Sequence, residues 1–319
     1  MIAQFISDSL IKYRKPNFVG KLVDKIFRIL RKIYLKINGN TLITFNLEGH
    51  RITVPFQHPL PIVRKIYKYY DSAIGRIPKY LTQKYSKFQA IDIGANVGDT
   101  AIIIKTQLDI PILCIEAENF YFQLLQLNTR DINGISYEQC FVGDLDKNNL
   151  QLITFSGSAR LVHTNEDKDL VRFKSLSEII KKHNGFNNVK YLKIDTDGFD
   201  CKIIRSNLAY IKMSRPVIFF EYDPNFLNQL DDDGLSVFIA LSEIGYENLL
   251  IYDNTGVFLI SAHIKDFKTL EELHLYYSGR QSEMFIDICV FHKEDNDIYS
   301  SIRDKEFKYF CERIDSKQE

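Results

Sequence analysis

Residues 88–100 read Phe88-Gln89-Ala90-Ile91-Asp92-Ile93-Gly94-Ala95-Asn96-Val97-Gly98-Asp99-Thr100. The apolar run before the acid is typical of a buried strand, and the two glycines bracket a tight turn. The apolar residues 101–104 that follow indicate the start of a helix. A glycine turn lets the backbone approach a ligand closely, and a helix start offers free N–H groups. The segment therefore predicts the strand, loop and helix of a nucleotide pocket.

The glycines follow the spacing Asp-x-Gly-x-x-x-Gly, which differs from the Gly-x-Gly-x-x-Gly of dinucleotide-binding folds. The difference favours S-adenosylmethionine (SAM), because SAM has no pyrophosphate to be held. We expect a side chain in place of Gly94 to occupy the space against which the donor lies. The loop residues expected to bind the cofactor are Asp92, Gly94, Ala95, Asn96, Gly98, Asp99 and Thr100.

Two further apolar runs also end in acids. The run over residues 111–116 ends in Glu116, which lies 18 residues after Gly98. An acid roughly 20 residues beyond the glycine turn accepts hydrogen bonds from ribose hydroxyls in nucleotide-binding folds. The run over residues 189–194 is followed by Asp195, Thr196 and Asp197. Because the carboxyl ends of parallel strands meet at one edge of a sheet, these acids predict one crevice there.

Four segments together resemble the FkbM family of SAM-dependent methyltransferases. They are Asp92–Asp99, Glu116-Ala117, Leu192–Gly198 and Pro216–Glu221. The resemblance covers residues 86–225 and continues more weakly to residue 292. It implies SAM as the cofactor, with Ala117 and Asp144 at the site and Asp144 near the adenine; the alternative for Asp144 is a turn residue. Where the family has Glu-Gly-x-Glu, this chain has Asp197-Gly198-Phe199-Asp200, with the same charges on shorter side chains.

The alternation of strands and helices predicts an α/β fold: a Rossmann-like sheet of seven strands, the last antiparallel, after an N-terminal helical and hairpin extension. Strands are expected at 88–93, 111–116, 135–142, 189–195, 217–222, 245–252 and 285–292, with 257–260 completing a hairpin. Helices are expected at 18–37, 62–74, 98–108, 119–128, 175–183, 198–208, 235–244 and 300–314. Residues 41–55 alternate as a hairpin, and Ser175 and Glu178 fit a capping box. Residues 145–188, with short strands at 150–155 and 170–176, are a candidate lid or acceptor loop.

We expect three parts along the chain: an extension over residues 1–80, a SAM-binding domain over 81–295 and a C-terminal helix over 296–319. Residues 1–36 hold nine Lys or Arg and two acids, a net charge of +7. Residues 18–37 have apolar positions at helical spacing with basic residues between them. This helix either lies on an anionic membrane surface or packs on its own domain or on a second subunit.

Composition excludes several classes of protein. Lys plus Arg and Asp plus Glu are both 41, so no overall positive field suits nucleic acid. The five cysteines form no Cys-x-x-Cys, which argues against a zinc ribbon or a thiol–disulfide motif. The N-terminus has no signal-peptide core and no stretch is long enough to span a membrane. These features predict a cytoplasmic protein, with peripheral contact at the inner face of the membrane if the basic helix binds lipid.

The candidate catalytic residues are Asp195, Lys193, His163 and Glu221. Methyl transfer to an alcohol needs removal of its proton, which a carboxylate or imidazole can accept. Asp195 is the first candidate as a base, with a loop-capping carboxylate as the alternative. Asp195, Asp197 and Asp200 suit a divalent cation, but their place at a helix start explains their charges equally well, so metal is not favoured.

The leading function is SAM-dependent O-methylation of a hydroxyl, and the resemblance suggests a sugar, a surface polysaccharide or a secondary metabolite as acceptor. One rival is a metal-dependent glycosyltransferase that uses Asp195-Thr196-Asp197 as its Asp-x-Asp motif. The other is a non-catalytic adaptor at the membrane surface that uses the basic N-terminal helix.

Overall fold

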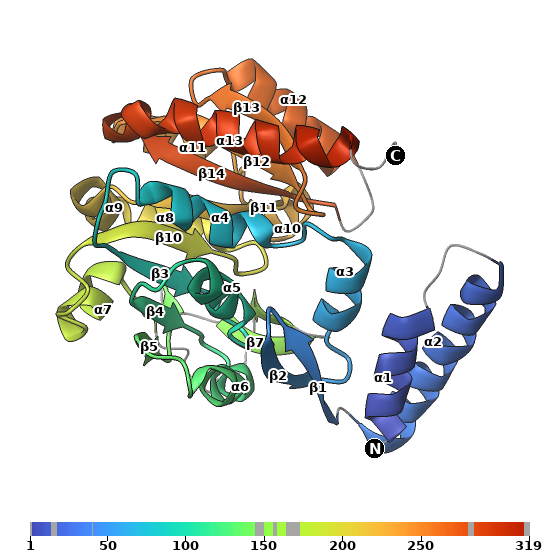
Figure 1. Ribbon diagram of the computed structural model, residues 1–319. Helices are drawn as coiled ribbons and strands as arrows, with labels where there is room; N and C mark the ends of the chain where they lie inside the picture. Colours follow the sequence, from blue (N-terminus) through green and yellow to red (C-terminus); the bar gives the residue numbers. More distant parts are fainter. Residues whose placement is uncertain are drawn as a thin grey trace.

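The computed structural model describes residues 2–13, 18–39, 41–143, 150–155, 158–163, 173–279 and 284–315. Its centre is an eight-stranded sheet in the order β13-β12-β14-β11-β10-β3-β4-β5 (Figure 1). The strands are β3 (Gln89–Ile93), β4 (Ile112–Ile115), β5 (Ile135–Glu138), β10 (Val189–Ile194), β11 (Val217–Tyr222), β12 (Tyr246–Asp253), β13 (Phe258–His263) and β14 (Ile286–His292). The strands β5, β4, β3, β10 and β11 are parallel, whereas β14 is antiparallel to both of its neighbours. The predicted Rossmann-like sheet is confirmed, and β13 adds an eighth strand at one edge.

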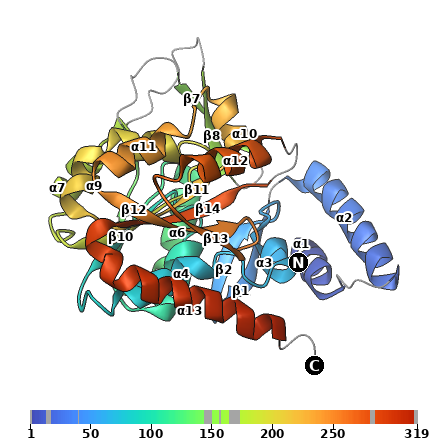
Figure 2. The same cartoon turned by 90° about the horizontal axis from the view of Figure 1, so that it is seen from above.

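Helices cover both faces of the sheet, because alternate strand residues are apolar on each side. Ile91 and Leu192 pack in the core beneath α7 (Leu176–Lys182), α8 (Asp200–Ser206), α9 (Leu208–Ser214), α10 (Pro224–Gln229), α11 (Ser236–Glu243) and α12 (Phe267–Ser278). Ala90 and Tyr191 pack on the opposite face, against α4 (Ser72–Leu81), α5 (Asp99–Gln107), α6 (Asn119–Thr129) and α13 (Asn296–Asp315). Figure 2 shows α13 and α11 on opposite sides of the sheet.

The N-terminal extension forms a third core beside the glycine turn. It consists of α1 (Ile2–Tyr13), α2 (Phe18–Asn38), the hairpin of β1 (Leu42–Leu47) and β2 (His50–Pro55), and α3 (Leu60–Ile66). Its buried residues Ile6 and Ile52 cluster with Val97 of the turn and Tyr121 of α6. In Figures 1 and 2, α1 and α2 lie side by side, away from the sheet. None of the helices in the described ranges has the length and apolar character needed to cross a bilayer.

Most expected elements are found, and the misses have local causes. The predicted strand 135–142 ends at β5; its last two residues form β6 (Phe141–Val142), which pairs with β9 (Phe173–Lys174) outside the main sheet. The predicted helix 62–74 is wrong, because α3 ends at Ile66 and α4 begins after Asp71, whose φ of 55° is left-handed. The predicted helix 198–208 breaks at Asn207, whose amide donates to Ile203 O and accepts from Leu176 N. The helices α1, α9, α10 and α12 were not predicted.

Other local predictions hold. The hairpin of β1 and β2 turns at Glu48 and Gly49. The strand predicted at 150–155 is β7 (Leu150–Phe155), and its partner β8 (Ser158–His163) was not predicted. The capping box at the start of α7 is confirmed, because Ser175 and Glu178 exchange hydrogen bonds with each other's backbone N–H.

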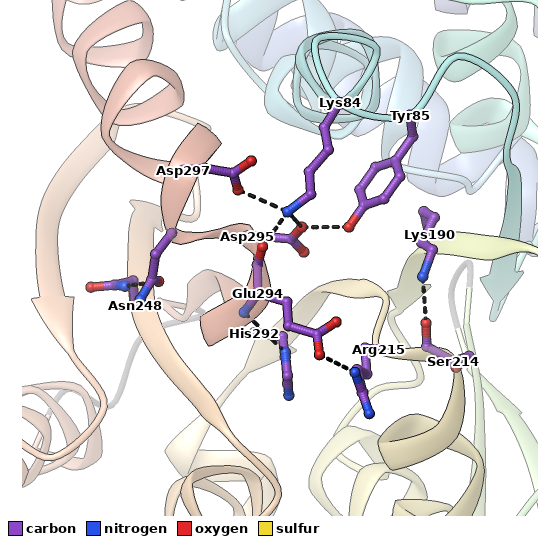
Figure 3. Close-up of polar contacts among 11 residues, drawn as sticks. Lys84, Tyr85, Lys190, Ser214, Arg215, Asn248, His292, Glu294, Asp295 and Asp297 are labelled. Carbon is purple, nitrogen blue, oxygen red and sulfur yellow. Dashed lines mark hydrogen bonds and ion pairs between the residues drawn. The ribbon is translucent and has the colours of Figure 1, made fainter.

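A polar cluster joins distant segments at the amino edge of the sheet (Figure 3). Lys84 Nζ lies 2.8 Å from Asp297 of α13 and 3.2 Å from Asp295, in the 3₁₀ turn η1 (Lys293–Asp295). Tyr85 donates to the same Asp295, whose side chain is buried. Arg215, just before β11, pairs with Glu294. The segment after α4 is thus tied to the start of α13, on the side of the sheet opposite the cavities described next.

Candidate active site

A cavity lies at the carboxyl ends of β3, β4 and β10 and encloses about 680 Å³, including its open mouth. Sites that bind small molecules have a few polar groups among apolar walls. The polar lining comes from Asn96, Glu116, Glu118, Asp195 and Asp197. The aromatic walls come from Tyr121, Phe141, Phe173 and Phe199. The cavity has the chemistry for a nucleoside with a charged tail.

Glu116 forms the fixed carboxylate of this cavity. Its two oxygens accept the backbone N–H of Asn96 at 2.9 Å and of Glu118 at 2.8 Å. Each oxygen keeps a lone pair, so a ribose diol can donate to it. Burial raises the pKa of Glu116 to about 7, against the lowering effect of these two backbone hydrogen bonds. The residues present therefore fit the ribose of SAM.

The two glycines of the turn have different roles. A Cβ at Gly94, where φ is +74°, would lie 1.8 Å from the carbonyl oxygen of Asp195. A Cβ at Gly98 would lie 2.9 Å from Leu125 and from Thr129 of α6. A side chain at Gly94 would therefore first collide with the end of β10, and the expectation that it also fills the donor's space stays a prediction. Gly98 allows α5 and α6 to pack.

Strand register places a buried cation between two acids. Lys193 is directly opposite Asp92 in the parallel pairing of β10 and β3. Its Nζ lies 3.1 Å from Asp92 Oδ1 and 3.5 Å from Asp195 Oδ2, and it donates to Gly94 O at 3.2 Å. Asp92 also accepts from Thr100 Oγ1. Although burial lowers it, the pKa of Lys193 is raised overall by Asp92, Asp195 and Asp99, so this side chain stays protonated and holds the turn to β10.

A second, smaller cavity of about 280 Å³ opens on the other side of Asp195. Its polar lining includes Tyr70, Asp71, Lys193, Asp195, Glu221 and Asp287. Glu221 and Asp287 are cross-strand neighbours in the antiparallel pairing of β11 and β14. Asp195, whose side chain is 46% exposed, lines both cavities. It therefore stands where two bound molecules would meet.

Burial has the largest effect on the pKa values of the acids in this second cavity. It raises the pKa values of Asp71, Glu221 and Asp287, and neighbouring carboxylates raise them further. Glu221 Oε1 is buried and has no hydrogen-bond partner among the described residues. A carboxyl group can donate a hydrogen bond when it is protonated and accept one in either form.

A third acid, which follows Asp195 and Asp197 in the chain, supports the loop over residues 195–197. Asp200 is fully buried and accepts from Thr196 Oγ1 at 3.0 Å and from Thr196 N at 3.3 Å. Burial raises its pKa to about 7. Within the described ranges, no group of three or more His, Cys, Asp or Glu side chains is arranged to hold a metal ion.

Comparison with known families decides the class of enzyme. Residues 34–248 match the model of the methyltransferase FkbM domain, which is more than half of the chain. The chain belongs to the FkbM methyltransferase family. It is a SAM-dependent methyltransferase, and this membership overturns the glycosyltransferase and adaptor alternatives as accounts of the domain. No curated protein is significantly similar to it in sequence.

Three solved structures of methyltransferases are similar to this chain at low sequence identity. The METTL16 methyltransferase domain is 12% identical, with a TM-score of 0.42, covering 83% of this chain and 78% of its own. An O-methyltransferase from Bacillus cereus in complex with SAH is 11% identical, with a TM-score of 0.37 and coverages of 82% and 97%. A geranyl diphosphate methyltransferase in complex with SAM is 7% identical, with a TM-score of 0.40 and coverages of 75% and 90%.

The residues predicted for this FkbM methyltransferase site differ in whether they line a cavity. Gly94, Asn96, Glu116 and Ala117 line the larger cavity, Lys193 and Glu221 line the acidic one, and Asp195 lines both. Asp92, Ala95, Gly98, Asp99 and Thr100 are buried in or beside the turn but do not line either cavity. Asp144 and the side chain of His163 lie outside the described residues, so their roles stay predictions.

Several lining residues were not predicted from the sequence. Tyr121 and Phe173 belong to helix and strand patterns that packing alone explains, so nothing marked them. Asp71 and Asp287 come from the start of α4 and from β14, far apart in sequence. Asp287 is an acid in an apolar strand, which is a usable signal, because a charge in a buried strand needs a reason.

Proposed function

We propose that this FkbM methyltransferase transfers the methyl group of SAM to a hydroxyl of a polyhydroxylated acceptor such as a sugar. The observation that carries the proposal is that Asp195 lines both the donor cavity and the acidic cavity. In-line methyl transfer needs donor and acceptor held about 3–3.5 Å apart across one point. The shared wall at Asp195 offers that point.

The donor cavity would hold SAM with its ribose at Glu116 and its adenine among the aromatic walls. Aromatic side chains suit the flat base, and the carboxylate suits the two ribose hydroxyls. When bound, SAM supplies a methyl group on a positively charged sulfonium. Asp195 and Asp197 add negative charge to the cavity wall, which favours a cationic ligand.

The acidic cavity would hold the acceptor. Hydroxyl groups donate to carboxylates and accept from protonated carboxyls, and burial raises the pKa values of Asp71, Glu221 and Asp287, which favours their protonated form. As the acceptor oxygen gains the methyl group, Asp195 takes the hydroxyl proton and S-adenosylhomocysteine leaves. Lys193 stays charged and positions Asp195, so we assign it no proton transfer.

The test is Asp195→Asn, assayed by SAM calorimetry and by methyl transfer to sugar acceptors. The variant keeps the size of the side chain but loses the basicity. We expect SAM affinity within a few-fold of wild type and a fall in turnover of about 10²–10⁴, the usual contribution of general acid–base catalysis. Asp231→Asn is the matched control, because Asp231 is exposed in a turn away from both cavities.

Full turnover by Asp195→Asn would show that Asp195 only caps the loop. Glu221 and His163 would then be the next candidates for the base. Activity that EDTA abolishes and Mg²⁺ or Mn²⁺ restores would replace the proton-transfer role with a metal. A wild type that binds SAM but methylates thiols or amines instead of hydroxyls would keep the donor assignment and reject the acceptor class.

A further inference from the structure

The helix α2 is held to the protein by one side. Phe27, Tyr34 and Leu35 pack against the core of the extension, and the Tyr34 ring meets Phe56 edge-on at 5.4 Å. Arg31 donates to the carbonyl oxygen of Phe56 from Nη2 at 2.9 Å and from Nε at 3.2 Å. These contacts fix the rotation of α2 about its axis, and therefore fix which side faces outward.

The outward side of α2 is an apolar stripe. Its five residues are 41–74% exposed: Ile26, Ile29, Leu30, Ile33 and Ile37. Their spacing of three and four places them on one face of the helix. Single exposed apolar residues are ordinary, but a contiguous patch of branched aliphatic side chains marks an interaction surface.

Basic residues border this stripe. Lys25, Lys32 and Lys36 are exposed, and at 100° per residue they fall in a sector of about 40° beside Ile29. Residues 25–38 contain no acid. Long lysine stems can lie along an apolar surface while their ammonium groups reach anionic headgroups.

The neighbouring helix α1 enlarges the surface. It runs antiparallel beside α2, and the Phe5 ring lies 6.1 Å from the Phe27 ring. Ile2 and Phe5 are both 64% exposed, whereas Ile6 and Leu10 of the same helix are buried in the core of the extension. The two helices together therefore present aliphatic and aromatic side chains outward.

We infer that this surface, the stripe of α2 with Lys25, Lys32 and Lys36 at its border, docks the enzyme on an anionic membrane. A helix with a strongly basic polar side and a branched aliphatic side lies in the plane of a bilayer interface. The choice of a bilayer over a protein partner rests on charge complementarity, because residues 25–38 carry five basic side chains and no acid. The extension also contacts the glycine turn through Val97, so the docking surface belongs to a part of the protein that packs directly on the turn.

The experiment is co-sedimentation of the full-length protein with vesicles of phosphatidylcholine alone or with 30% phosphatidylglycerol, a composition of about one anionic lipid in three. Truncation is unsuitable, since it would remove Ile6 and Leu10 from the core. Ile29→Asp/Ile33→Asp removes the centre of the stripe, and Lys25→Gln/Lys32→Gln/Lys36→Gln removes its charged border. Met213→Asp/Leu275→Asp is the matched control, because both residues are 72% exposed on other helices.

We expect wild type and control to bind anionic vesicles, with binding that weakens as salt screens the charges over about 8 Å at physiological ionic strength. The Ile variant should lose at least tenfold in partition on every vesicle, since burial of one isoleucine contributes more than the 1.4 kcal/mol that tenfold represents. The Lys variant should lose roughly 100-fold on anionic vesicles and little on neutral ones, at about fivefold per residue. SAM calorimetry on each variant shows that the site is intact.

Equal vesicle binding by the Ile variant and wild type would overturn the inference. So would a wild type that ignores vesicles but elutes as a dimer which the Ile variant dissociates, because the stripe would then join two copies. Neither result bears on SAM binding or methyl transfer, so failure here is distinguishable from failure of the proposed function.

Discussion

Glu116 combines two tasks in one side chain. It fixes the glycine turn through the backbone N–H groups of Asn96 and Glu118, and it presents its remaining lone pairs to the donor cavity. Burial gives it a pKa of about 7 in place of 4.5. A carboxyl group with this pKa changes its charge near neutral pH, so its charge state should affect cofactor binding.

We predict that SAM affinity rises as pH rises through about 7, because the carboxylate is the better acceptor for ribose hydroxyls. Hydrogen bonds to a charged group contribute roughly 1.5–3 kcal/mol and neutral ones about 0.5–1.5. Glu116→Gln should therefore bind about tenfold more weakly than wild type at pH 8 and nearly equally at pH 6. Calorimetry at both pH values measures this, and below pH 7 wild type should release a proton on binding.

The same shift has the opposite sign for folding. Because burial raises the pKa of Glu116, its contribution to stability is present below about pH 4.5 and is lost as the pH rises through about 7. The apoprotein should thus lose stability over the interval in which it gains affinity. A wild-type dissociation constant that does not change between pH 6 and pH 8 would contradict the role given to Glu116.

For single residues, the sequence identifies the acids that lie at the ends of predicted strands. It does not identify the acids that only the tertiary structure brings to the site. Asp92, Glu116 and Asp195 follow apolar runs, so pattern and topology bring them to one edge. Asp71 lies at a left-handed backbone position between two helices, and Asp287 faces Glu221 only through the register of β11 and β14. Tertiary pairing of that kind leaves no local signal.

Among the elements, α6 joins the extension to the cofactor turn through one side chain. Asn128 accepts from Thr53 N at 2.7 Å, donates to Thr53 O at 2.8 Å and donates to Val97 O at 2.8 Å. It thereby acts as an extra strand residue at the edge of β2 and, at the same time, supports the turn that carries Asn96.

We predict that Asn128→Ala lowers both stability and SAM affinity. Three backbone hydrogen bonds are lost, each contributing roughly 0.5–1.5 kcal/mol, so the free energy of unfolding should fall by about 2–4 kcal/mol in urea. Asn119→Ala is the control on the same helix, where the side chain is exposed. If Asn128→Ala unfolds like the control, β2 and the turn do not depend on this bridge.

Helices and strands were predicted well where the apolar periodicity is unbroken. They were predicted poorly where a tertiary contact ends the element before the periodicity does. The strands β3, β4, β10 and β11 match their predicted ranges to within one residue at each end. The break at Asn207 depends on its bonds to two separate helices, and β6 leaves the sheet to pair with β9. Neither partner can be seen in the local sequence.

For the whole molecule, the C-terminal helix holds the segment that enters the acidic cavity. Arg76 of α4 makes two hydrogen bonds to Glu306 of α13, at 2.8 and 2.7 Å, and Tyr252 donates to the same carboxylate at 3.0 Å. The guanidinium also lies 4.0 Å from the centre of the Tyr309 ring. Asp71 at the start of α4 lines the acidic cavity, so α13 supports the acceptor side of the site from the far end of the chain.

We predict that Glu306→Gln destabilises the protein by roughly 3–5 kcal/mol, because removing one partner leaves a buried guanidinium without its counter-ion. The SAM dissociation constant should stay near wild type, since neither α4 nor α13 lines the donor cavity. Turnover should fall more than affinity, as Asp71 loses its support. The control is Arg303→Gln on the same helix: its ion pair with Asp304 is 46% and 70% exposed, and such pairs contribute about 0–1 kcal/mol. Urea denaturation and calorimetry on both variants separate the readouts. A Glu306→Gln protein as stable as the control would show that apolar packing of α13 alone holds α4, and a matching loss of SAM affinity would show that the two cavities are coupled through the sheet.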